Sequence, residues 1–175
     1  MTATLPPART RTYSWADPSV YRKAGGRNGL DTLRLILAGE LPPPPITQTL
    51  DYAAVEFDEG RAVFTMRVAE HHYNPLGSVH GGVIATLLDT CTGCALHTTL
   101  PAGLAYTSLD LTTKFLRAVT VESGLLRCEG RVISKGRTTA LAEAHLYDEA
   151  GRLMAHATST LLIFAQPASD GSESQ

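Results

Sequence analysis

Near the N-terminus, hydrophobic positions first recur at helical spacing. Leu30, Leu33 and Ile36 lie three residues apart, and four consecutive prolines follow from Pro42. Apolar residues at this spacing mark one face of a helix, and proline cannot continue a helix. The pattern therefore predicts a short amphipathic helix and, after it, an extended linker.

Alternating segments predict strands on either side of a second, longer apolar stretch. Residues 49–57 and 61–69 flank the sequence Asp-Glu-Gly, which is a turn signal, and predict a hairpin. The links between the later segments are too short for parallel crossovers, so we expect an antiparallel sheet. The later strands are expected at Ser108–Leu116, Val121–Ser134, Arg137–Asp148 and Leu153–Phe164.

The stretch from about Gly81 to Thr98 is apolar on nearly every side, which predicts a buried helix. A curved antiparallel sheet can bury one of its faces on such a helix. We therefore predict an α+β fold: a five- to six-stranded curved antiparallel sheet wraps one long central helix, with a short extra helix before it. In the strand that follows the helix, alternation places on one face Leu109, Leu111, Thr113 and Phe115.

The chain has 175 residues, which suits one domain with its own core. Both ends are rich in small, polar or proline residues and are predicted to be disordered. The expected organisation is a disordered N-terminus (1–17), a helix with a proline-rich linker (18–47), the folded domain (48–165) and a disordered tail (166–175).

Composition excludes several classes of partner. The formal net charge of −2 gives no electrostatic basis for binding nucleic acid or a membrane surface. No apolar run reaches membrane-spanning length, and the first residues lack the apolar core of a secretory signal. Three cysteines at scattered spacing do not suggest a disulfide framework. We expect a cytoplasmic protein with reduced thiols.

The pair Gly81–Gly82 stands where the long helix should begin. A helix N-terminus leaves backbone N–H groups without intrahelical partners, and these donors can hold an anion or a developing oxyanion. Glycine has no side chain that would block access to them. A tight turn or a close backbone crossing would explain the same two residues.

Asp89 is a carboxylate inside the apolar helix. It is costly to bury without a partner, so it could line a cleft and serve there as a base or a nucleophile, or it could be a structural acid. Eight residues of helix separate it from Gly81, a rise of about 12 Å. A single reacting carbon needs both groups within roughly 3 Å. If both residues are catalytic, they must come from different subunits.

The segment Asn74–Asp89 resembles the signature of hotdog-fold thioesterases of the phenylacetate-pathway type, and it is similar to the human thioesterase-superfamily-member-2 type. These families have Asn, a Gly, His-Gly-Gly and then an acid eight residues after the first glycine of that pair. The matching residues here are Asn74, Gly77, His80, Gly81, Gly82 and Asp89. The resemblance covers about residues 48–165.

The resemblance implies hydrolysis of an acyl-CoA thioester to a free acid and CoA. Asp89 would activate the water or attack the carbonyl directly, and the Gly81 N–H of the partner subunit would polarise that carbonyl. His80 would help to place the thioester, and Asn74 would orient the water or the acyl group. Ser108 would support the attacking water. Two further substrate contacts are expected at Gly82 and at Thr107, which is the alternative to Ser108.

The phosphates of CoA require positive charge nearby. Lys135 and Arg137 flank Gly136 in a hairpin turn, and Arg117 is a second candidate. A solvated hairpin turn would explain Lys135, Gly136 and Arg137 equally well. The resemblance implies no metal and no cofactor apart from the CoA of the substrate, and it implies a homodimer that can pair into a homotetramer. The pocket walls would come from residues 86–96 and from segments near Tyr73 and Tyr106.

Three other motifs in the sequence do not indicate a site. Cys91 and Cys94 form a C-x-x-C pair, but they lie well inside the helix rather than at its start, so we expect mostly buried thiols. The histidines match no common zinc spacing. A serine-esterase reading of His-Gly-Gly fails because no G-x-S-x-G nucleophile occurs. Two rivals within the same fold are a non-catalytic acyl-CoA-binding module and a hydratase or dehydratase.

Overall fold

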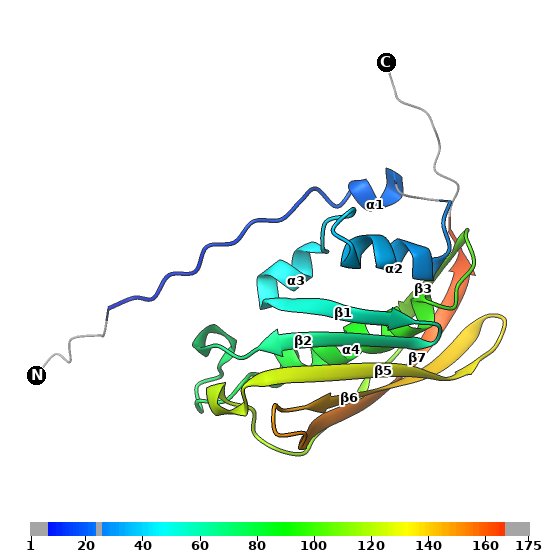
Figure 1. Cartoon of the computed structure of the whole chain (residues 1–175). Coiled ribbons are helices and arrows are strands. Elements are labelled where there is room, and N and C mark those ends of the chain that lie inside the picture. Colours follow the sequence, from blue (N-terminus) through cyan, green and yellow to red (C-terminus); the bar gives the residue numbers. More distant parts are fainter. Residues whose placement is uncertain (1–6, 24–25, 167–175) are drawn as a thin grey trace, which may run out of the picture.

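The computed structural model describes residues 7–23 and 26–166 (Figure 1). Parts of the two predicted disordered ends, residues 1–6 and 167–175, lie outside the described residues. The helices are α1 (Val20–Lys23), α2 (Gly29–Leu37), α3 (Pro45–Leu50) and α4 (Gly81–His97). The strands are β1 (Tyr52–Asp58), β2 (Arg61–Arg67), β3 (Leu104–Ser108), β4 (Thr112–Phe115), β5 (Leu125–Lys135), β6 (Thr139–Tyr147) and β7 (Leu153–Ala165). Two short 3-10 turns lie at Glu70–His72 and Val121–Ser123.

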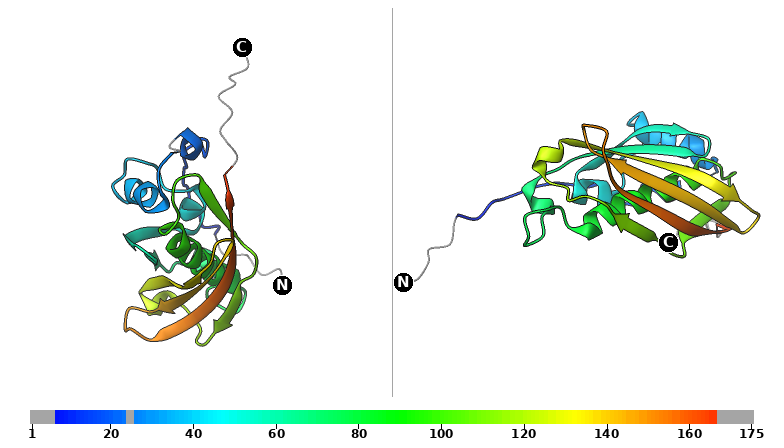
Figure 2. Two further views of the ribbon diagram at one scale, coloured as in Figure 1. Left: turned by 90° about the vertical axis from the view of Figure 1, so that its right-hand side faces the viewer. Right: turned by 90° about the horizontal axis from the view of Figure 1, so that it is seen from below.

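One antiparallel sheet curls around the long helix α4, as Figure 2 shows. The strand order is β1-β2-β5-β6-β7-β3, and β4 also pairs with β7. The predicted architecture of a curved antiparallel sheet around one long helix is therefore confirmed. None of the helices in the described ranges is long and apolar enough to cross a membrane.

The helix α4 supplies the centre of the hydrophobic core. Leu87, Leu88 and Cys91 are completely buried against the sheet. The strand β5 passes so close to the helix that a Cβ added at Gly130 would lie 2.2 Å from the backbone oxygen of Cys91. Only glycine permits this approach, because a side-chain atom cannot occupy that space.

The helices α2 and α3 cover the β1 end of the sheet, and α2 also contacts α4 (Figure 1). Asn28 caps α2 by accepting a hydrogen bond from the Asp31 N–H, and Leu33 buries its side chain in the core. An extended linker was expected as far as residue 47 and a strand from residue 49. Both expectations were wrong at residues 45–50, which form the helix α3, and the strand β1 begins only at Tyr52. Pro45 occupies the first position of α3, where proline's missing N–H costs no intrahelical bond.

The expected single strand Ser108–Leu116 was also wrong. Only β4 lies wholly within it, because the preceding strand, β3, begins at Leu104 and ends at Ser108, and the two strands pair with successive parts of β7. Between them, Asp110 turns the chain: its side chain accepts from the Thr160 N–H at 3.0 Å, and its carbonyl accepts from the Ser159 hydroxyl at 2.7 Å. The sheet therefore has seven strands rather than five or six.

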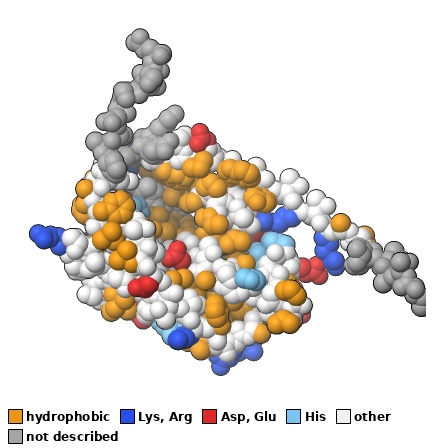
Figure 3. Space-filling model, turned by 180° about the vertical axis from the view of Figure 1, so that it is seen from behind, with side chains coloured by type: hydrophobic (Ala, Val, Ile, Leu, Met, Phe, Trp, Pro, Cys, Tyr) orange, Lys and Arg blue, Asp and Glu red, His pale blue; other side chains and the backbone are white. Residues whose placement is uncertain are grey.

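The shared face predicted for this segment is not uniformly buried. Leu109 and Phe115 are more than half exposed, whereas Leu111 packs against the core. Figure 3 shows the side of the molecule that faces away in Figure 1, where hydrophobic side chains gather around a hollow in the upper half.

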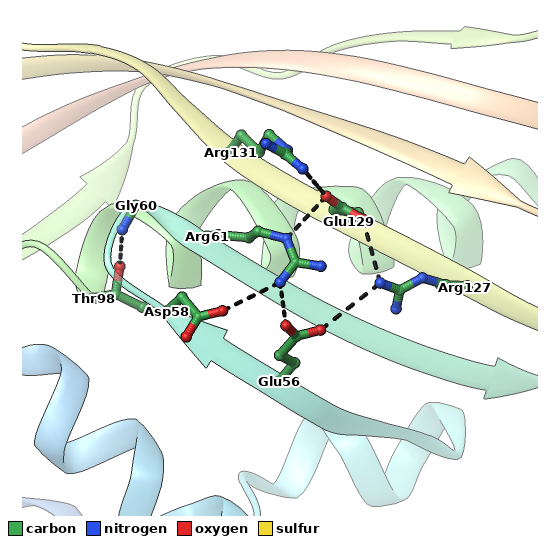
Figure 4. Close-up of polar contacts among 8 residues, drawn as sticks. All are labelled: Glu56, Asp58, Gly60, Arg61, Thr98, Arg127, Glu129 and Arg131. Carbon is green, nitrogen blue, oxygen red and sulfur yellow. Dashed lines mark hydrogen bonds and ion pairs between the residues drawn. The ribbon is translucent and has the colours of Figure 1, made fainter.

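Arginines and carboxylates form an ion-pair network on the β1-β2-β5 part of the sheet (Figure 4). Arg61 contacts Glu56 and also Glu129, the latter at 3.0 Å, and Arg131 contacts Glu129 at 2.6 Å. The Arg61 hydrogen bond, with a contribution from Arg131, lowers the pKa of Glu129 to about 2.

Replacing Gly130 with alanine should destabilise the fold strongly. The new methyl group would overlap the helix backbone, and neither β5 nor α4 can shift freely within a packed core, so we expect a loss of about 3 kcal/mol or more. Urea denaturation at fixed protein concentration measures it. The control is Gly151→Ala, where φ is +78° and the space is open, which should cost only about 1–2 kcal/mol. Equal losses would show that the close approach does not limit this packing.

Glu129→Gln should reduce the acid sensitivity of the fold. A carboxyl group whose pKa is lowered by folding contributes stability above its unfolded pKa, near 4.5, and that contribution is lost as the pH falls toward about 2. We expect the variant to lose about 1 kcal/mol at neutral pH, where solvent screens the ion pairs, and to show a flatter decline between pH 5 and pH 2. Urea midpoints across this range measure it, and parallel curves for both proteins would contradict it.

Candidate active site

The predicted acid and serine meet in the structure. Asp89, half-buried on α4, accepts a 2.8 Å hydrogen bond to Oδ1 from the hydroxyl of Ser108 at the end of β3. Both residues line a cavity of about 400 Å³. Thr107 is exposed and is not among the lining residues, because successive side chains of a strand point to opposite faces. Of the two neighbouring candidates, Ser108 is therefore the one that contacts the acid.

The groups around Asp89 are polar but uncharged. Burial raises the pKa of Cys94 to about 12 and the pKa of Tyr106 well above its usual value, and the nearby Asp89 charge adds to both shifts. The Tyr52 hydroxyl bonds to the Thr90 hydroxyl at 3.0 Å, and burial raises the pKa of Tyr52 to about 12. Asp89 is therefore the one carboxylate among the residues that line this cavity.

Of these neighbours, Tyr52 is the one to which the sequence did not point, because Thr90, Cys94 and Tyr106 lie in the expected pocket walls. Tyr52 and Thr90 come from different elements, and their contact depends on the placement of β1 beside α4. Tyr106 lies against Gly93, where an added Cβ would come within 2.7 Å of its ring. A glycine in the middle of a helix is itself a signal of close packing, and this signal could have pointed to the aromatic partner. Tyr73, which was also expected in the pocket wall, instead accepts a hydrogen bond from the Val121 N–H.

The N-terminus of α4 presents one open donor. His80 is the N-cap residue, and its ring Nδ1 accepts from the Gly82 N–H at 2.9 Å. The Val83 N–H donates to the His80 carbonyl. Among the hydrogen bonds of the described residues, none uses the Gly81 N–H. The His80 ring therefore occupies the N–H of Gly82 and leaves the N–H of Gly81 free, a distinction that the spacing of the motif does not predict.

Gly81 lines a second cavity, of about 360 Å³, together with Phe115 and Arg117. The Arg117 guanidinium is exposed and donates to the Leu153 carbonyl at 2.6 Å. The structure therefore places the open donor and the acid in two different cavities of one chain. This arrangement agrees with the rise of about 12 Å that eight helical residues produce.

The loop before α4 is shaped by Asn74. Its side-chain oxygen accepts from the Leu76 N–H at 2.8 Å, and its amide donates to the Ser78 hydroxyl at 3.1 Å. The structure thus shows Asn74 bonded within its own loop, next to the N-terminus of α4.

The other predicted phosphate contacts lie away from both cavities. Lys135 donates from Nζ to the Thr99 carbonyl at 2.5 Å, just beyond the C-terminal end of α4. Gly136 and Arg137 are exposed in the β5–β6 turn. One chain therefore does not bring these three residues to Asp89 or to Gly81.

The three cysteines are free thiols, as expected. Cys91 and Cys128 are fully buried, and burial holds the pKa of Cys91 well above its ordinary value. A thiol with a raised pKa is a poor nucleophile, so the C-x-x-C pair has the character of core packing. Across residues 7–23 and 26–166, no three histidine, cysteine or acidic side chains gather in a way that could hold a metal ion.

Comparison with known proteins agrees with this architecture. The family model of the thioesterase superfamily matches residues 76–155. A candidate esterase of the archaeon Saccharolobus solfataricus is 30% identical over 118 residues, which cover 67% of this chain and 82% of that protein. The human acyl-coenzyme A thioesterase 13 is 29% identical over 102 residues, which cover 58% of this chain and 71% of that protein.

A solved structure extends the likeness to three dimensions. A candidate thioesterase from Ralstonia eutropha JMP134, described as a phenylacetic acid degradation-related protein, superposes with a TM-score of 0.67 at 30% identity, covering 74% of this chain and 97% of that one. The resemblance inferred from the Asn74–Asp89 signature is thereby confirmed. The chain belongs to the thioesterase superfamily and is a hotdog-fold thioesterase of the phenylacetate-pathway type.

Proposed function

We propose that this thioesterase hydrolyses an acyl-CoA thioester at two equivalent sites, each shared between the two subunits of a homodimer. The observation that carries the proposal is the separation of the machinery. Asp89 and Ser108 lie in one cavity, and the open Gly81 N–H lies in another. The similarity to a human acyl-coenzyme A thioesterase supports the choice of CoA thioesters.

In the proposed reaction, Asp89 accepts a proton from water while the water oxygen attacks the thioester carbonyl carbon. Attack by the carboxylate itself, followed by hydrolysis of the resulting anhydride, is the alternative path. The Gly81 N–H stabilises the oxyanion that forms on the carbonyl oxygen. The carbon–sulfur bond then breaks, and CoA leaves as a thiolate that takes up a proton. Ser108 holds the carboxylate in position, and its hydroxyl lies next to the attacking water.

The edge of the sheet supports a dimer. β3 ends the strand order, and three apolar side chains on and beside β4 and β3 are about half exposed: Leu109, Phe115 and Leu116. An open strand edge with apolar side chains is a surface that pairs readily with another chain. Pairing of two copies at this edge would form one continuous sheet. A homotetramer, as a dimer of such dimers, remains an expectation from the resemblance.

The two cavities suggest the direction in which the substrate lies. Arg117 lines the cavity of Gly81, so the CoA portion would lie on that side, and the acyl portion would extend past Asp89 of the other subunit. His80 and Asn74 would then act mainly by fixing the helix start and its loop. Lys135, Gly136 and Arg137 would reach the phosphates only from a neighbouring subunit. Gly82 and Thr107 would be peripheral contacts.

Asp89→Asn should abolish most of the turnover. The amide keeps the size of the side chain and can still accept from Ser108, but it cannot take a proton, so we expect kcat to fall about a hundredfold or more. Steady-state assays on short-, medium-chain and aryl acyl-CoA substrates measure it. Glu143→Gln, an acid on β6 that lines neither cavity, is the control and should keep normal turnover. Near-normal activity of folded Asp89→Asn would overturn the role of Asp89.

Gly81→Pro should test the oxyanion donor without disturbing the helix. Proline is favoured at the first helical position, and His80 already has the extended backbone that precedes proline. The variant removes the N–H, and we expect kcat to fall about a hundredfold. Gly81→Ala adds a Cβ, close to the Phe115 ring, but keeps the N–H; it is the matched control and should retain far more activity.

A mixed dimer tests whether sites are shared. One chain carries Gly81→Pro and the other carries Asp89→Asn, and the heterodimer is purified with two different affinity tags. If sites are shared, one site has both defects and the other has none, so we expect about half of the wild-type activity. If each site belonged to one chain, both would be defective and the heterodimer would be inactive.

A further inference from the structure

The cavity at Asp89 extends away from the acid, under the N-terminal helices. Its walls come from α4 and β3 at one end and from α2, α3 and β1 at the other. Apart from the acid, Thr90 and Ser108, the lining is largely apolar. The larger apolar side chains of the lining include Leu33, Ile36, Ile46, Tyr52, Phe57 and Phe64. Figure 3 shows hydrophobic side chains around a hollow on this side of the molecule.

The N-terminal wall is fixed to the rest of the fold. Gly29, the first residue of α2, donates to the Leu100 carbonyl at 2.9 Å, and an added Cβ there would collide with the His97 carbonyl oxygen. The end of α3 is held by the ring of His72, whose Nε2 lies 3.0 Å from the Leu50 oxygen. These contacts attach α2 to the C-terminal end of α4 and the residues just after it, and α3 to the 3-10 turn that precedes α4. Both helices of the wall are therefore tied to the folded domain.

This wall lies outside the segment that the thioesterase-superfamily model matches, which begins at residue 76. The catalytic carboxylate comes from the matched segment, whereas most of the apolar lining comes from residues 33–64. The acid and the wall that faces it are thus supplied by different parts of the chain.

We propose that α2 and α3 form the acyl-binding wall and select a medium-chain apolar acyl group, with on the order of ten carbons. This inference rests on the proposed thioester hydrolysis, because it places the carbonyl carbon at Asp89. The cavity volume of about 400 Å³ offers room for on the order of ten groups of water size, at about 30 Å³ each. Apolar walls favour an alkyl chain over water, whereas an acetyl group would leave most of the space unfilled.

The size and apolar lining of the cavity lead to an expected selectivity for acyl chain length. One additional methylene in an apolar pocket can change kcat/KM by about tenfold or more. A pocket of this size should therefore strongly favour medium-chain acyl-CoA over acetyl-CoA. Blocking the far end should remove the preference without affecting the chemistry at Asp89. Ile46 lines the cavity from α3 rather than from α4, which carries the acid, and is 43% exposed, which makes it the position to enlarge.

The test is Ile46→Trp, assayed with decanoyl-, phenylacetyl- and acetyl-CoA. In the wild-type protein we expect kcat/KM for decanoyl-CoA to exceed that for acetyl-CoA at least tenfold. In Ile46→Trp, decanoyl-CoA should lose about tenfold or more, mainly through KM, while acetyl-CoA changes less than about threefold. Val55→Trp is the matched control: Val55 on β1 is 44% exposed and does not line the cavity, so its acyl profile should be unchanged.

A second readout does not depend on turnover. S-decyl-CoA, a thioether without a carbonyl, cannot be hydrolysed, and calorimetry should show that it binds at least tenfold more tightly than CoA alone, with the difference lost in Ile46→Trp. If no acyl-CoA is hydrolysed but this binding pattern holds, the hydrolytic function fails and the acyl wall stands. A preference for acetyl- or phenylacetyl-CoA, or a decyl effect that Ile46→Trp leaves unchanged, would overturn the acyl wall.

Discussion

The enclosure of one apolar helix by a single curved sheet is the constraint on which the rest of the structure depends. Leu87, Leu88 and Cys91 have no exposed surface, and Gly130 lets β5 approach the helix backbone directly. A helix held this closely cannot rotate or slide without overlapping the sheet. Its remaining positions, including Asp89 and the N-terminal glycines, are therefore fixed in space by packing that has no part in the chemistry.

Enclosure also decides where polar chemistry is possible. The sheet covers most of α4, so a carboxylate on the helix must face a part that the sheet leaves open. Asp89 does so beside Ser108, among hydroxyl and thiol groups whose raised pKa values keep them neutral. At the helix start, His80 satisfies the Gly82 N–H and leaves Gly81 as the available donor. A mobile loop would not hold a carboxylate or a donor as rigidly.

Turn residues and hydrophobic patterning predicted those helices and strands that depend mainly on neighbouring residues in the sequence. The hairpin around residues 58–60 and the helix α4 follow from turn residues and from uninterrupted apolar character. The helix α3 was missed because its prolines favoured an extended linker, although proline is also suited to a first helical position. The break between β3 and β4 was missed because Asp110 bonds to Ser159 and Thr160, about fifty residues away, and alternation carries no information on such a partner.

The sequence by itself determined the family, the candidate acid and the argument that Gly81 and Asp89, if both act at one carbon, must come from different chains, since helix rise alone separates them. Only the tertiary structure decided that Ser108 rather than Thr107 meets the acid, that Lys135 lies at the end of α4 opposite Gly81, and that α2 and α3 line the cavity of Asp89. The physical reason is that spacing along a helix is fixed by local geometry, whereas the neighbours of a side chain are fixed by how distant segments pack.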